Sequence, residues 1–278
     1  MYHPISPDQP IRIAVMGLSG VGKTTLARCL PSSRWFHYSV DYRIWTHYLG
    51  DELNDYLKKL AMAHPLLRDM LQRDAITVEH RVHFDNLLAT SLYMGMLGNP
   101  KKHGSTLTDF SERMASHATA EIAAMLDIPK FIQRAENLYG YPHFLADLSG
   151  SLCEVVDPRA EHDPVLDMID ENLTLIYIRA TKSHEKVLIE RNIADPKPIY
   201  YRPDFVAAEL PGLLEKYKVH NVTDLSPRQV GAYLYPRLLA HRVERYEAIA
   251  AEHALTLTME EAAAIGSESD LLERLMQA

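Results

Sequence analysis

A run of eight residues near the start of the chain constrains the fold more than any other feature. Residues 17–24 are Gly-Leu-Ser-Gly-Val-Gly-Lys-Thr, which fits the pattern GxxxxGK[ST] at every position. The apolar, β-branched run Ile11–Met16 before it is typical of a buried strand. A helix is expected after it, from Lys23 to Leu30, ending near Pro31. The pattern therefore predicts a strand, a glycine-rich loop and a helix in succession.

This loop has the chemistry needed to hold phosphate groups. Glycine lets the backbone turn tightly and approach an anion, and the N–H groups at a helix start face that anion. Lys23 adds a positive charge at the outer phosphates, and the hydroxyl of Thr24 is a ligand for magnesium. We therefore expect ATP and Mg²⁺ as cofactors, with the nucleotide held by Gly17, Leu18, Ser19, Gly20, Val21, Gly22, Lys23, Thr24 and Thr25.

Five short apolar runs separated by helical segments predict an α/β fold with a parallel sheet covered on both faces. The expected strands are residues 11–16, 35–40, 143–148, 173–178 and 255–258. Helices are expected at 183–192, 204–217, 227–252 and at the C-terminus. The long helical stretch 44–140 is interpreted as an insertion, a substrate or partner subdomain, within a single domain 1–278.

Two aspartates follow predicted strands and are candidates for the chemistry. Asp147 ends the run HFLAD, and an apolar strand ending in Asp is typical of a magnesium-phosphate site. Asp41 ends the run WFHYSVD and is better placed to orient or deprotonate a substrate hydroxyl. Either residue could instead be a turn or capping aspartate, and the sequence leaves open which of them serves the metal.

A proline-rich segment supplies the positive charge that phosphoryl transfer needs. Arg191, Lys197 and Arg202 lie in or beside ADPKPIYYRP, residues 194–203, which cannot be regular helix. No helix-spaced acidic partner is visible for these three cations. They predict catalytic residues on a lid at 190–204, although a solvated surface loop would have the same composition.

The chain resembles the small P-loop kinases, the group of nucleotide, gluconate and shikimate kinases. The likeness lies in GLSGVGKT, in SVDYRI at 39–44 and in Arg191 followed by Lys197-Pro198. It implies a P-loop NTPase fold with strand order 2-3-1-4-5 and a lid closing over ATP and acceptor. SVDYRI and SLCE also resemble a group of bacterial predicted ATPases of unassigned substrate. The helical stretch 44–140 is not covered by the kinase resemblance.

Two functions follow from these motifs. The favoured one is a kinase that transfers the γ-phosphoryl group of ATP to a small-molecule hydroxyl or phosphate. The alternative is a P-loop ATPase switch acting on a protein partner, because Asp147–Gly150 matches the switch pattern DxxG. ATP is favoured over GTP, since the guanine signature NKxD occurs nowhere in the sequence.

Composition argues against several other classes. The net charge of -8 and the pI near 5.9 disfavour a general binder of nucleic acid or anionic membrane. Two cysteines provide no disulfide framework, and the first ten residues carry no secretory pattern. We therefore expect a cytoplasmic protein.

Overall fold

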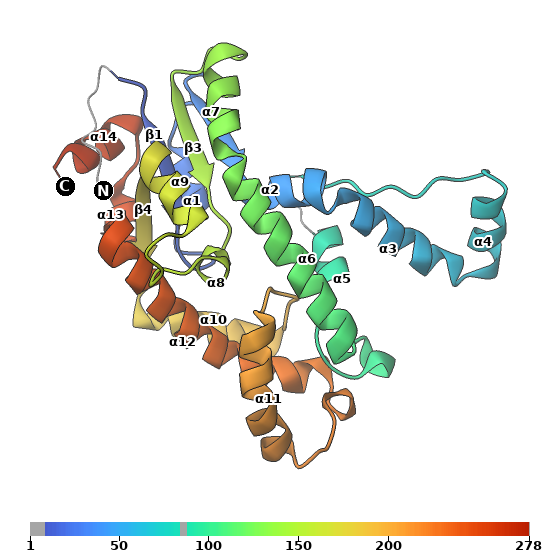
Figure 1. The fold of residues 1–278 in the computed structure, drawn as a ribbon. Coiled ribbons are helices and arrows are strands. Elements are labelled where there is room, and N and C mark those ends of the chain that lie inside the picture. The colour runs from blue at the N-terminus through green and yellow to red at the C-terminus, as the bar shows by residue number, and fades with distance from the viewer. Residues whose placement is uncertain (1–8, 84–87, 278) are drawn as a thin grey trace. The chain divides into compact units, whose positions relative to one another are not determined.

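The computed structural model describes residues 9–83 and 88–277. Within these residues, five strands form one all-parallel sheet in the order β2-β3-β1-β4-β5 (Figure 1). The strands are β1 (Arg12–Met16), β2 (Trp35–Ser39), β3 (His143–Asp147), β4 (Thr174–Arg179) and β5 (Ala254–Thr258). The predicted α/β class, the five strands and the strand order are confirmed.

The strands read as continuous apolar runs because the sheet is buried. Ile13 and Ala14 of β1 have no exposed surface, and Ile176 and Ile178 of β4 have none either. Since neighbouring residues of one strand face opposite sides, both faces of the sheet must be covered. Ala14 pairs with Leu175 of β4, so β1 lies between β3 and β4 in the middle of the sheet.

The chain divides into two compact units. The described residues of the first unit are 9–40, 121–195 and 232–277, which contain the whole sheet. Those of the second unit are 41–83, 88–120 and 196–231. The predicted insertion 44–140 is therefore divided, with its first part in the second unit and residues 121–140 in the first.

Helices of the first unit pack on the sheet. The packed helices are α1 and α7 on β3, α7 also on β2, α9 on β4, and α13 on β4 and β5. The helices of this unit are α1 (Lys23–Arg28), α7 (Ile128–Asn137), α8 (Leu152–Val155), α9 (Pro164–Asn172), α10 (Lys182–Ala194), α13 (Met259–Ala264) and α14 (Glu268–Met276). The predicted C-terminal helix is thus two helices, separated at Gly266.

The second unit is helical and contains no strand among its described residues. Its α-helices are α2 (Val40–Arg43), whose first residue belongs to the first unit, α3 (Gly50–Met62), α4 (Pro65–Gln72), α5 (Leu88–Met94) and α11 (Pro203–Tyr217). A π-helical turn spans Ile44–Tyr48, and 3₁₀ turns span Pro100–Lys102 and Val222–Asp224. Two long helices, α6 (Leu107–Leu126) and α12 (Pro227–His253), run from this unit into the first.

Several parts of the predicted helical stretch are not helical, and two of them have a cause in the sequence. The chain leaves helix between Met62 and Pro65, and Pro65 takes the first position of α4, which suits proline because an N–H there would have no partner within the helix. Residues 76–82 have no regular structure, and their first three, Ile76, Thr77 and Val78, are β-branched residues that disfavour helix. The predicted helix over HRVHFDNLLATSLYMGML is therefore shorter, and its residues 84–87 lie outside the described residues.

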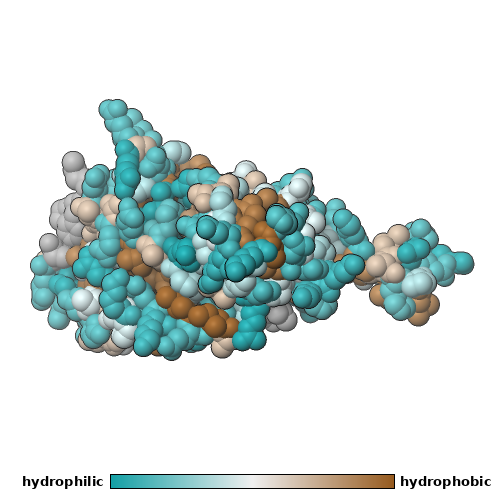
Figure 2. Space-filling model, turned by 90° about the horizontal axis from the view of Figure 1, so that it is seen from below, coloured by the Kyte–Doolittle hydropathy of each residue, from teal (hydrophilic) through white to brown (hydrophobic). Residues whose placement is uncertain are grey.

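The surface in view is mostly hydrophilic (Figure 2). Some apolar side chains are exposed on α3 and α4 of the second unit, including Leu60 and Leu66. None of the helices among the described residues combines the length and the apolarity needed to cross a bilayer.

The loop after α5 depends on a glycine. Gly98 has a φ of +144°, and a Cβ built there would lie 2.9 Å from the backbone nitrogen of Pro227. The next residue, Asn99, donates its N–H to the carbonyl of Leu225 at 2.8 Å. Close backbone packing at this point therefore joins two chain segments of the second unit.

We expect Gly98→Ala to destabilise the protein by about 2 kcal/mol or more in urea unfolding, because both the φ and the contact become strained. The matched control is Gly50→Ala at the start of α3, where the nearest atoms would lie at 3.5 Å and φ is ordinary. Its unfolding free energy should stay within about 1 kcal/mol of the parent. Equal stability of the two variants would contradict the close packing at Gly98.

Candidate functional site

The glycine-rich loop joins the central strand β1 to α1. Gly17, Gly20 and Gly22 have φ angles of +143°, +77° and +113°, a region that other residues rarely adopt. A Cβ on Gly17 would lie 2.7 Å from the carbonyl oxygen of Ile178 in β4. The loop therefore turns in a space that only glycine fits, at the edge where the strands have their carboxyl ends.

Lys23 folds back over this loop. Its Nζ donates to the carbonyl oxygens of Gly17 at 2.9 Å and Leu18 at 3.2 Å. Gly22 is the N-cap of α1 and offers no side-chain acceptor to the N–H groups of the first turn. Thr24 and Thr25 are exposed on that turn. A cation, exposed hydroxyls and backbone donors thus meet at one short loop, which is what an oxyanion requires.

Asp147 lies beside this loop. It is the last residue of β3 and pairs in register with Val15 of β1, two residues before Gly17. Burial raises the pKa of Asp147, and the positive charge of Lys23 partly opposes the shift. The structure therefore brings together two of the predicted site residues, Lys23 and Asp147.

His184 is a contact of the loop that sequence reasoning missed. This residue lies in the first turn of α10, and its Nε2 is 3.0 Å from the carbonyl oxygen of Ser19. Because a carbonyl only accepts, Nε2 carries the hydrogen here. A Cβ on Gly20 would lie 3.3 Å from the imidazole ring, so the glycine also makes room for it. A lone histidine among fourteen gives no sequence signal for such a role.

The segment that follows Asp147 is held by buried polar groups. Glu121 of α6 has no exposed surface and accepts hydrogen bonds from the hydroxyls of Ser149 and Ser151. Burial raises the pKa of Cys153 in this segment to about 12, so its thiol stays protonated and unreactive at neutral pH.

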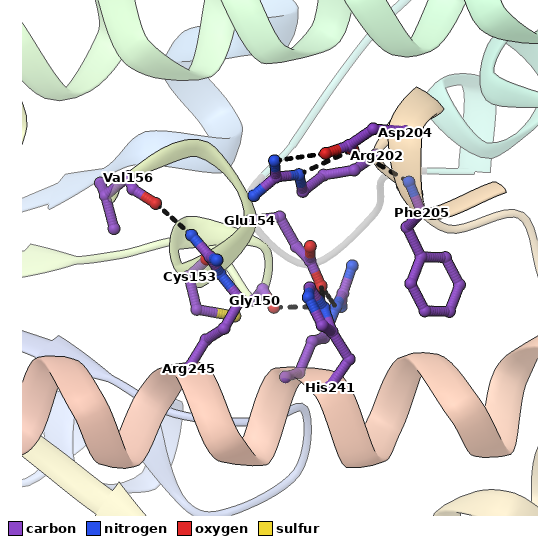
Figure 3. A network of polar contacts seen from close by, with 10 residues as sticks. Gly150, Cys153, Glu154, Val156, Arg202, Asp204, Phe205, His241 and Arg245 are labelled. Carbon is purple, nitrogen blue, oxygen red and sulfur yellow. Dashed lines mark hydrogen bonds and ion pairs between the residues drawn. The ribbon is translucent and has the colours of Figure 1, made fainter. Parts of the chain in front are cut away.

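Helix α12 holds the same segment with two arginines one turn apart. Arg242 donates from Nη1 to the carbonyl of Gly150 at 3.1 Å and from Nε to Oε1 of Glu154 at 3.2 Å. Arg245 donates to the carbonyls of Cys153 and Val156. In this short turn, the side chain of Glu154 accepts from a side chain of α12, and Arg245 of α12 donates to the backbone (Figure 3).

The predicted lid cations fall in different units. Arg191 is exposed on α10 of the first unit. Burial raises the pKa of Tyr235 in α12, and the charges of Arg242 and Arg191 partly oppose that shift. Lys197 is exposed and Arg202 is half-buried, and both belong to the second unit. Asp41, the predicted substrate residue, is half-exposed in α2 and also belongs to the second unit.

Arg202 has an acidic partner that is not at helical spacing. Its Nε and Nη2 donate to the two carboxylate oxygens of Asp204 at 2.9 and 2.6 Å (Figure 3). The hydrogen bond from Arg202 lowers the pKa of Asp204. Helical spacing does not indicate this pair, because the two residues are only two positions apart.

The segment between these cations is irregular, as predicted, and is anchored by tyrosines. Tyr200 stacks on His117 of α6 with ring centroids 5.2 Å apart, and the N–H of Tyr201 donates to the sulfur of Met114. Both tyrosines are buried within the second unit. Their rings serve packing there.

The residues beside the loop fit a magnesium–phosphate group better than a metal held by protein alone. Within the described part of the chain, no three His, Cys, Asp or Glu side chains come close enough to hold a metal ion. Magnesium bound to a nucleotide takes most of its ligands from phosphate and water and needs one or two protein oxygens. Thr24 and Asp147 can supply these oxygens, next to a cradle that a Cβ at Gly17 would fill.

Comparison with protein-family models, with curated proteins and with solved structures gives no match for this chain.

Removing the charge of Asp147 should stabilise the protein in the absence of ligand. Because burial raises its pKa above the ordinary 3.8, the folded state disfavours the carboxylate. The wild type should therefore lose stability relative to Asp147→Asn as pH rises from about 4 through the raised pKa.

The measurement is urea unfolding of both proteins between about pH 4 and 7, without nucleotide or magnesium. Asp55→Asn, which changes a carboxylate that is 77% exposed, is the control and should show no such pH-dependent gain. If Asp147→Asn is less stable than the wild type at pH 7, the carboxylate stabilises the folded state, which contradicts a raised pKa for Asp147.

Proposed function

We propose that the chain binds ATP with Mg²⁺ at Gly17–Thr25 and transfers the γ-phosphoryl group to a hydroxyl or phosphate of a small molecule. One observation carries the proposal: the glycine-rich loop with Lys23 follows the central strand of a parallel sheet, with Asp147 of the neighbouring strand beside it. Ligands of open α/β sheets bind at this kind of strand-order switch point. The proposed family is that of the P-loop NTPases.

Each residue of the loop site has a role in this proposal. The backbone N–H groups of the loop bind the phosphates, and Lys23 exchanges its carbonyl partners for phosphate oxygens. Thr24 and Asp147 hold the magnesium, Asp147 directly or through water. When bound, the metal neutralises charge that develops on the phosphates.

The acceptor side of the reaction is assigned to four further residues. Asp41 orients or deprotonates the acceptor hydroxyl, and Arg191, Lys197 and Arg202 add positive charge around the transferred group. Arg202 keeps its two hydrogen bonds to Asp204 in this proposal, so its guanidinium would add charge from a fixed position. The segment 190–204 is proposed as a lid: its ends belong to α10 and α11, its middle, 195–202, is irregular, and Tyr200 and Tyr201 anchor it.

A second candidate is an ATPase switch that acts on a protein partner. The observation that favours it is the segment Leu148–Val156, which follows Asp147 directly and is held by polar contacts to α6 and α12. Such contacts can have two alternative arrangements that depend on the bound nucleotide. The motifs GLSGVGKT and DLSG are compatible with either function.

Lys23→Ala should lower ATP affinity or turnover on the order of 10²-fold, because the ammonium group would bind phosphate oxygens. The fold should be kept, since the side chain is half-buried over the loop and not in the core. Nucleotide binding is measured by calorimetry and folding by urea unfolding. Lys182→Ala, at a lysine side chain 85% exposed, is the control. Full binding by a folded Lys23→Ala variant would refute the phosphate site.

The reaction type is tested by incubating the protein with ATP, Mg²⁺ and a pool of metabolites. A kinase produces a new phosphorylated compound, and ³¹P NMR with mass spectrometry detects it. We expect Asp41→Asn to lower this transfer by about 10²-fold or more while ATP binding is retained. The matched control Asp55→Asn should transfer normally.

If only ADP and free phosphate form, whatever metabolite is present, the kinase proposal fails and the switch is favoured. Unchanged transfer by Asp41→Asn would remove this residue from the acceptor site.

A further inference from the structure

Buried charged side chains lie in and around the segment that follows Asp147. The side chain of Glu154 is fully buried, that of Arg242 is 12% exposed, and Glu121 has no exposed surface. Oε2 of Glu154 is buried and has no hydrogen-bond partner. Removing charges from water costs free energy that a buried ion pair seldom recovers completely. Stability alone therefore does not account for this cluster.

The contacts of this cluster are made to one short stretch, at the backbone of Gly150 and at the hydroxyls of its two neighbours. Gly150, whose carbonyl accepts from Arg242, comes three residues after Asp147. The flanking residues Ser149 and Ser151 are bound through their hydroxyls to Glu121. Helix α6 thereby fixes Ser149 and Ser151, and α12 fixes Gly150 between them, close to the start of the segment at Asp147.

The position of Arg242 also depends on its partner. Glu154 accepts from Nε of Arg242 at 3.2 Å and so orients its guanidinium. Glu154 also lies 3.3 Å from Nδ1 of His241 (Figure 3). A guanidinium holds two acceptors at once in a fixed geometry, which an ammonium group cannot do. Gly150 and Glu154 are the two acceptors in this case.

We infer that Arg242 is a positioning residue for the nucleotide site: together with Glu154 it fixes Gly150 and thereby the segment that begins at Asp147. This inference rests on the proposed function, because Asp147 matters only if the metal and the nucleotide bind beside it. A displacement of about 1 Å at a reacting group can cost on the order of 10²-fold in rate. Arg242 acts through Asp147 and does not touch the nucleotide.

The test separates positioning from stability by removing the charges one at a time and then together. Arg242→Met leaves a buried carboxylate alone and should lower the urea midpoint. The double variant Arg242→Met/Glu154→Met has no buried charge at this pair and should recover most of that loss. Both variants should lose about 10-fold or more in the kcat of ATP consumption, measured with the metabolite pool present. Their ATP affinity should stay within about threefold of wild type. Half-saturation by Mg²⁺ should shift to a higher concentration.

Arg245→Met is the matched control. Arg245 lies on the same helix and donates to backbone carbonyls of the same segment, at Cys153 and Val156, which are further from Asp147. It should lower the urea midpoint and leave kcat within about twofold of wild type, if only the contact near Asp147 positions the site.

Three results would overturn the inference. The first is wild-type kcat in a double variant of restored stability, and the second is an equal kcat loss in Arg245→Met. If the double variant does not fold, Arg242→Lys is used, which keeps the charge but not the two-acceptor fork; wild-type kcat there is the third. A wild-type protein that neither phosphorylates any metabolite of the pool nor hydrolyses ATP would refute the proposed function itself, and the inference with it. The other three results would overturn the inference and leave the proposed function standing.

Discussion

The geometry of a parallel sheet is the constraint on which the rest of this structure depends. All five strands among the described residues point the same way, so their carboxyl ends share one edge. β1 lies between β3 and β4 in the middle of the sheet, and the chain leaves it through the glycine-rich loop at this edge. Gly17 makes this passage possible beside the carbonyl of Ile178, and Asp147 ends its strand next to it.

The same constraint creates a difficulty after β3. The chain turns away from Asp147 through a buried segment whose carbonyls have few partners in regular structure, and buried backbone groups must be satisfied. Arg242 and Arg245 of α12 donate to Gly150, Cys153 and Val156. The ionic groups near the proposed site are therefore part of how this segment is built, which links the packing of α12 to the position of Asp147.

The strands, the glycine-rich loop and Asp147 could be predicted because each depends on residues close together in sequence. A buried strand needs only its own apolar run, and the loop needs its glycines in fixed order. The contacts to Ser149, Gly150 and Ser19 could not be predicted, because their partners Glu121, Arg242 and His184 are 28, 92 and 165 residues away. Pro65 favours a helix start, but the sequence alone does not fix a break there, because Pro211 and Pro236 lie inside α11 and α12.

The central claim, that Gly17–Thr25 binds the phosphates of a nucleotide, is tested most directly by hydrogen exchange of the wild-type protein. Exchange is followed with and without a non-hydrolysable ATP analogue and Mg²⁺. The account predicts slower exchange of the backbone amides in 17–25 and in 148–151, with α14 unchanged. Binding of the analogue with unchanged exchange in 17–25 and slower exchange elsewhere would contradict it.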